Sequence, residues 1–227
     1  MIITIDGPAA SGKSTVAREL ARRLGYHHLS TGLLYRGLAY LLITMSDYNE
    51  VTIAQPSEEE VIDFLDPEKF SYFEDVDSLG HVSWDGKDIT HYLKTPEIDT
   101  AASLLSSNPM VREYLLEYQR WFGDTYDMVA DGRDLGSVVY PNADVKFFLT
   151  AQPEERARRW LADQVKKGNA LSLQQALTAV NERDSRDRER AVCPLIQPAD
   201  AIIVDNTDLA PQQTLDAMMA IIQQKID

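Results

Sequence analysis

The stretch MIITIDGPAASGKSTVARELARRLG, residues 1–25, decides the fold of this chain. Residues 2–5 are apolar or β-branched, a run that predicts a buried strand. After a glycine-containing loop, apolar side chains recur at a helical spacing of four, at Val16, Leu20 and Leu24. The next residue is a glycine, which is typical of a helix C-terminus. We therefore expect a strand, a glycine loop and an amphipathic helix in that order.

The loop fits the pattern GxxxxGK[ST], and each fixed position has a physical role. The two glycines let backbone N–H groups turn inward, and the helix N-terminus adds partial positive charge, so the loop suits a phosphate chain. The lysine reaches the terminal phosphates, and the serine hydroxyl is a ligand for Mg²⁺. We predict that ATP is bound by Gly7, Pro8, Ala9, Ala10, Ser11, Gly12, Lys13, Ser14 and Thr15.

The rest of the chain alternates further strand patterns with helical ones. Strands are expected at 27–30, 127–130, 145–149 and 201–204. Alternation of this kind predicts an α/β fold, with a parallel sheet covered by helices on both faces. We expect one domain over residues 1–227, because this length suits a single large core.

One region interrupts the alternation. Residues 47–77 hold eleven acidic residues and one lysine, and short strand-like runs follow at 71–73, 81–84 and 87–89. Turn signals stand at Leu79-Gly80 and Asp85-Gly86. We predict a small antiparallel insertion over about 66–94, and the alternative is a solvated loop with one hairpin.

Composition excludes several classes of partner. The 227 residues carry a formal charge of −14, which opposes binding to nucleic acid and to anionic membranes. The single cysteine, Cys193, cannot form an intramolecular disulfide. No signal-peptide pattern and no long apolar run is present, so we expect a cytoplasmic protein with no membrane partner. We also expect a monomer.

Three functions compete for a nucleotide-binding loop. A GTPase needs an NKxD guanine-binding signature, which is absent. The only isolated DxxG motif lies at 77–80, within the acidic region, where chance explains it. A nucleotide-gated binding protein needs the loop alone. A small-molecule kinase needs a second set of cationic residues for its acceptor phosphate. The sequence offers such a set at Arg36, Arg133, Arg156, Arg158, Arg159, Arg183, Arg186, Arg188 and Arg190.

The chain resembles the bacterial cytidylate kinases, of the type with an enlarged insertion. The motifs that carry the resemblance are TIDGPAASGKSTVA, STGLLYR, SNPMVRE, ADGRDLGSVVYPNADVKFFLTAQPEERARR and ERDSRDRERAVCPLIQPADAIIVDNT. The resemblance implies a P-loop kinase with a five-stranded parallel sheet, a monophosphate-binding region that contains the insertion, and an arginine-bearing lid at about 152–170. The chain departs from the family pattern at Ser30, where aspartate is expected, and at Leu33, where alanine is expected.

The resemblance also implies roles for individual residues. Arg36, Arg133, Arg183 and Arg190 resemble phosphate ligands, and Asp187 a ligand of the ribose hydroxyls. Thr31 lies near the same nucleotide, and the lid contributes Arg156 and Arg158. At the base, Asp134 and Ser103 face the cytosine amino group and Arg112 its acceptors. Asp131 resembles the carboxylate that organises Mg²⁺ through water, although a carboxylate capping the following turn has the same pattern. The catalytic set predicted is Lys13, Arg133, Arg156, Arg158 and Arg183.

The implied reaction is phosphorylation of CMP and dCMP by ATP with Mg²⁺, through direct in-line transfer. Its nucleophile is a phosphate oxygen that is largely ionised at pH 7, so no general base is needed. Two alternatives stay open: a broader UMP/CMP kinase, and a P-loop protein that binds nucleotide without catalysis.

Overall fold

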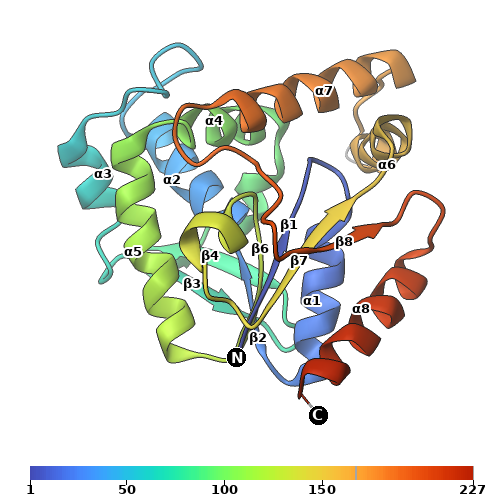
Figure 1. The fold of residues 1–227 in the computed structure, drawn as a ribbon. Coiled ribbons are helices and arrows are strands. Elements are labelled where there is room, and N and C mark those ends of the chain that lie inside the picture. Colours follow the sequence, from blue (N-terminus) through green and yellow to red (C-terminus); the bar gives the residue numbers. More distant parts are fainter. Residues whose placement is uncertain (167, 227) are drawn as a thin grey trace.

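The computed structural model describes residues 1–166 and 168–226. Its central sheet has five parallel strands in the order β2-β6-β1-β7-β8 (Figure 1). Their bounds are β1 Ile2–Asp6, β2 His27–Ser30, β6 Met128–Asp131, β7 Val145–Thr150 and β8 Ile202–Asp205. The α/β fold class with this five-stranded sheet is confirmed, and each strand overlaps its predicted range.

Helices cover both faces of the sheet. They are α1 Lys13–Leu24, α2 Thr31–Met45, α3 Glu58–Phe64, α4 Pro96–Leu105, α5 Pro109–Thr125, α6 Pro153–Lys166, α7 Leu173–Glu189 and α8 Pro211–Ile226. Two short turns, η1 Thr90–Lys94 and η2 Leu135–Val139, complete the list. On one face α1 and α8 bury Val16, Leu20 and Met218 against β1 and β7. On the other, α2, α4 and α5 form the larger core.

A second, antiparallel sheet is built from β3 Phe70–Glu74, β4 Gly80–Trp84 and β5 Lys87–Asp88. Asp85 and Gly86 both have positive φ, 49° and 73°, as a tight hairpin turn between β4 and β5 requires. The predicted antiparallel element is therefore confirmed, and the single-hairpin alternative is wrong. The turn expected at Leu79-Gly80 lies slightly earlier, because Asp75 accepts hydrogen bonds from the backbone of Asp77 and Leu79 and Gly80 already belongs to β4.

The chain breaks between α4 and α5 at Ser106 to Asn108. The side chain of Asn108 caps α5 by accepting hydrogen bonds from the backbone N–H groups of Met110 and Val111, and Pro109 occupies the first helical position. The two helices therefore meet at an angle and bring α4 beside α2 and α7 (Figure 1).

Within residues 1–166 and 168–226, no helix is long and apolar enough to cross a bilayer.

Candidate active site

The loop between β1 and α1 has the backbone that its glycines predict. Gly7 has φ 147°, and a Cβ there would lie 2.1 Å from the carbonyl oxygen of Leu149 on β7, so only glycine fits. Gly12 has φ 93° at the N-terminus of α1. The loop is also anchored from outside: the backbone N–H of Ala9 donates to Asp184, and its carbonyl accepts from Arg156. The loop is thus held in shape at the carboxyl edge of the sheet.

Lys13 is buried within this loop, with 5% of its surface exposed. Its Nζ donates to the Pro8 carbonyl at 2.6 Å and lies 3.3 Å from the Ser11 hydroxyl. Burial lowers the pKa of Lys13 well below its usual value, the guanidinium of Arg133 lowers it further, and Asp131 opposes both. An anion beside Nζ would therefore strongly favour the charged lysine.

Ser14 and Asp131 meet at the start of α1. The Ser14 hydroxyl donates to Asp131 Oδ2 at 2.7 Å, and His28 Nε2 donates to Oδ1 at 2.9 Å. Burial would raise the pKa of Asp131, but these hydrogen bonds and the charge of Lys13 lower it. Because the carboxylate bonds to Ser14 and His28, it does not cap the following turn. Two oxygen ligands beside a phosphate loop fit Mg²⁺, which takes few protein ligands and completes its shell with phosphate and water.

A second group of charged residues lies between α2, α4 and α7. Arg36 on α2 donates from Nε and Nη2 to Asp99 Oδ1, at 2.8 and 2.6 Å. Arg183 on α7 donates from Nη1 to the other oxygen, Oδ2. Beside them Arg133 donates to Asp187 Oδ2 at 2.7 Å. The structure thus brings three predicted phosphate ligands together with two carboxylates. Asp99 was not predicted.

Arg190 continues the group towards α5. It donates through Nη2 to Asp134 Oδ1 at 3.2 Å, while Arg112 donates to Oδ2 of the same carboxylate. Both guanidiniums also contact Ser106, which the sequence analysis missed. Arg190 lies just beyond α7, which ends at Glu189, and its backbone is no longer helical.

Ser103 and Thr31 lie at the edges of this group. Ser103 is buried, and its hydroxyl lies 3.4 Å from Arg186 Nε. Thr31 donates its hydroxyl to the Asp131 carbonyl at 2.9 Å. Thr31, the first residue of α2, therefore links the start of this helix to the backbone at the end of β6.

Asp6, at the end of β1, connects the phosphate loop to the segment after Asp134. Its two oxygens accept hydrogen bonds from the backbone N–H groups of Leu135 and Gly136, at 2.9 and 2.7 Å. Burial raises the pKa of Asp6 to about 6 even though these hydrogen bonds lower it. Neither this role of Asp6 nor the short π turn η2 that it supports was predicted from the sequence.

The predicted lid arginines take different positions. Arg156 is buried and joins Asp184 on α7 to the Ala9 carbonyl, so it supports the phosphate loop. Arg158 is exposed and contacts Glu155, so the structure does not bring it to the loop. Its neighbour Arg159 lies there instead, with Asn206, which donates to the Ser11 carbonyl. Within the expected lid, Lys167 lies outside the described residues.

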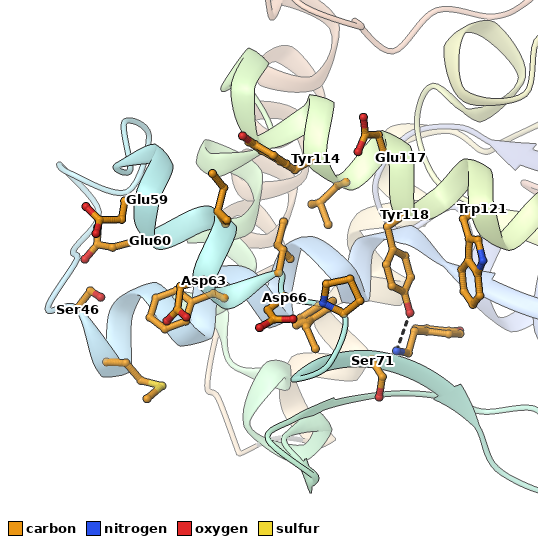
Figure 2. Close-up of a pocket in the computed structure, with 18 residues that line it drawn as sticks. Ser46, Glu59, Glu60, Asp63, Asp66, Ser71, Tyr114, Glu117, Tyr118 and Trp121 are labelled. Atoms are coloured by element: carbon orange, nitrogen blue, oxygen red, sulfur yellow. Dashed lines mark hydrogen bonds between the residues drawn. The ribbon is translucent and has the colours of Figure 1, made fainter.

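A separate groove of about 1360 Å³ lies between α3, α5, β3 and the end of α2 (Figure 2). Aromatic side chains, including Tyr118 and Trp121, line it beside several carboxylates. The carboxylates are Glu59, Glu60, Asp63, Asp66 and Glu117. Its described lining includes none of the predicted site residues.

A phosphate loop at the carboxyl edge of a parallel sheet, faced by clustered arginines, defines a P-loop kinase. A cytidylate kinase family model matches residues 3–224. The cytidylate kinase of Desulfitobacterium hafniense (strain Y51) is 38% identical over 225 residues, covering 99% of this chain and 94% of the relative. That of Citrobacter koseri is also 38% identical, with 99% and 96% coverage.

The chain therefore belongs to the cytidylate kinase family, and it is an enzyme. The alternative of a binding protein without catalysis is wrong. A solved structure of an uncharacterized protein from Eubacterium ventriosum shares the fold, with a TM-score of 0.53 at 14% identity, covering 99% of this chain and 98% of that one.

Proposed function

We propose that this enzyme transfers the terminal phosphoryl group of ATP to CMP and dCMP, giving ADP and the corresponding diphosphates. The observation that carries the proposal is the convergence of two sites at one sheet edge. The loop of residues 7–14 offers donors for a triphosphate, and Arg36, Arg133 and Arg183 offer donors for an acceptor phosphate.

The residues act by positioning and by charge. Lys13 and the guanidiniums neutralise charge as the phosphoryl group moves between two oxygens, and the acceptor oxygen attacks without a base because it is already ionised. Ser14 and Asp131 would hold Mg²⁺, which neutralises phosphate charge when bound. Arg156 and Arg159 keep the loop rigid. We further propose that residues 152–170 close as a lid, which excludes water during transfer.

Base recognition favours cytosine. Cytosine offers an amino donor at N4 and acceptors at N3 and O2, which a carboxylate and a guanidinium can satisfy together. Asp134 and Arg112 supply this pair. Uracil reverses the donor pattern and would leave both groups facing like partners, and hydrogen-bonding sites of this kind discriminate strongly. The competing proposal is a broader UMP/CMP kinase. In either case we propose a monomer that works in the cytoplasm.

The test is a coupled assay of ADP release from ATP with CMP, dCMP, UMP or AMP, with and without Mg²⁺. We expect CMP and dCMP to be used well and UMP and AMP poorly. Equal use of UMP and CMP would support the broader kinase, and a preference for AMP would contradict the proposed base site.

A further inference from the structure

We propose that Asp99 is an internal competitor of the acceptor phosphate and sets the affinity of the acceptor site for anions. Its carboxylate binds the guanidiniums of Arg36 and Arg183, and a nucleoside monophosphate must take its place before phosphoryl transfer. This inference rests on the proposed function, because it concerns the acceptor phosphate.

Asp99 uses both of its oxygens on these two arginines. Oδ1 accepts from Nε and Nη2 of Arg36, and Oδ2 accepts from Nη1 of Arg183. Across residues 1–166 and 168–226, neither guanidinium has another hydrogen-bond acceptor. Since carboxylate and phosphate use the same donors of an arginine, the two anions compete for one position.

A phosphate has the means to displace this carboxylate. Arg183 Nε is buried and has no hydrogen-bond partner among the described residues, so Asp99 leaves a donor unsatisfied. A phosphate monoester brings three terminal oxygens and a charge of about −1.5 to −2 at pH 7, against two oxygens and a single charge. It can therefore satisfy donors that Asp99 cannot.

The neighbouring arginines keep the Asp99 carboxylate ionised. Burial would raise the pKa of Asp99, but attraction to Arg36 and Arg183 and the hydrogen bonds from Arg36 hold it well below its usual range. Burial and the neighbouring arginines Arg133 and Arg36 lower the pKa of Arg183, and Asp99 opposes this. Asp99 therefore stabilises the charged forms of Arg36 and Arg183, and Asp187 supports Arg183 and Arg133 in the same way. Its side chain is 28% exposed, so it can turn towards water when an anion replaces it.

This arrangement keeps small anions from filling the acceptor site. Inorganic phosphate gains only the arginine contacts and must break the Asp99 ion pairs to obtain them. A nucleotide gains additional contacts at its base and ribose, which the proposed function assigns to Asp134, Arg112 and Asp187. Asp99 thus weakens the binding of both anions by a similar factor and leaves the ratio of their affinities unchanged. The nucleotide still binds through its other contacts, whereas inorganic phosphate, which has none, leaves the site largely unfilled.

The test compares binding of inorganic phosphate to the wild-type chain and to Asp99→Asn by titration calorimetry. We expect Asp99→Asn to bind phosphate about tenfold more tightly, because one partly exposed charge pair no longer opposes binding. Asp99→Glu keeps the charge and should bind phosphate as weakly as the wild type. Asp216→Asn, which removes an ion pair between α8 and Arg23 in the last turn of α1, is the matched control and should leave phosphate binding unchanged.

Kinetics supply the second readout: Asp99→Asn should lower the KM for CMP without raising kcat. Unchanged or weaker phosphate binding in Asp99→Asn, equal tightening in Asp99→Glu, or a higher KM for CMP would each show that Asp99 only holds the arginines in place. A wild-type chain that fails to phosphorylate CMP would contradict the proposed function, yet the phosphate titration would still decide the role of Asp99.

Discussion

Carboxylates at the carboxyl edge of the central sheet and carboxylates of the acidic region have opposite surroundings. Asp134 and its partner Arg112 have 9% and 8% of their side chains exposed, whereas Asp63 and its partner Lys69 have 59% and 37%. Water screens the second pair and hardly reaches the first. The same residue types are therefore solvated in one region and desolvated in the other, so charge density by itself does not locate a site.

The largest difference in activity is expected when one lysine from each region is replaced by alanine. Lys13→Ala should lower kcat/KM by about 10³-fold or more, because it removes a buried cation beside the transferring phosphate. Lys69→Ala, in the acidic region, should leave kcat/KM unchanged. Steady-state ADP release measures both, with circular dichroism to check the fold. A folded Lys13→Ala variant with near-normal activity would contradict the mechanism.

The aspartates give a second matched pair. Asp134→Ala should narrow the CMP-to-UMP ratio of kcat/KM by about 10²-fold, because the carboxylate that favours the cytosine amino group is lost. Asp63→Ala removes an exposed ion pair and should leave the ratio as it is. If Asp134→Ala keeps the wild-type CMP-to-UMP ratio of kcat/KM, other residues recognise cytosine.

Asp6 allows a test by pH. Its pKa is raised from 3.8 to about 6, so the folded chain binds a proton more tightly than the unfolded chain, and stability falls as pH rises through this window. We expect the contribution of Asp6 to the free energy of unfolding to fall by about 2 kcal/mol between pH 4.5 and 7. Urea unfolding of the wild type and of Asp6→Asn at both pH values isolates this contribution. The free energy of unfolding of the wild type, relative to that of Asp6→Asn, should be lower at pH 7 than at pH 4.5. A difference that is constant with pH would refute this.

The smallest effect on activity and stability is expected from substitutions in the groove of Figure 2. Glu59→Gln and Glu117→Gln alter exposed carboxylates at its rim, and we expect kcat/KM to stay within about twofold and stability within about 0.5 kcal/mol. The same assays apply. A large loss of activity would mean that the groove communicates with the sheet edge.

The sequence predicts the fold well because its signals are local. The strand, loop and helix of residues 1–25 are specified by spacing within one short segment, and so is the cap at Asn108. The partners of the predicted site residues are not local: Asp99 meets Arg36 and Arg183 across 63 and 84 residues of sequence. No sequence periodicity predicts such long-range ion pairs, because they depend on how α2, α4 and α7 pack.

The lid shows a second limit. Arg158 and Arg159 are adjacent in sequence and equally basic, and only the rotation of α6 against its neighbours decides which one reaches the loop. Asp6 shows a third, because a buried carboxylate that holds two backbone N–H groups has the same local sequence as any strand end.

The position of β1 at the centre of the sheet has a consequence for biosynthesis. Ile2 pairs with Met128 and Ile3 with Val145, so both neighbours of the first strand are translated long after it. The first helix and its loop therefore leave the ribosome without the surface they pack on, and contacts this distant in sequence form slowly. We expect the ability to bind nucleotide to arise late in synthesis, after β7 has emerged from the ribosome.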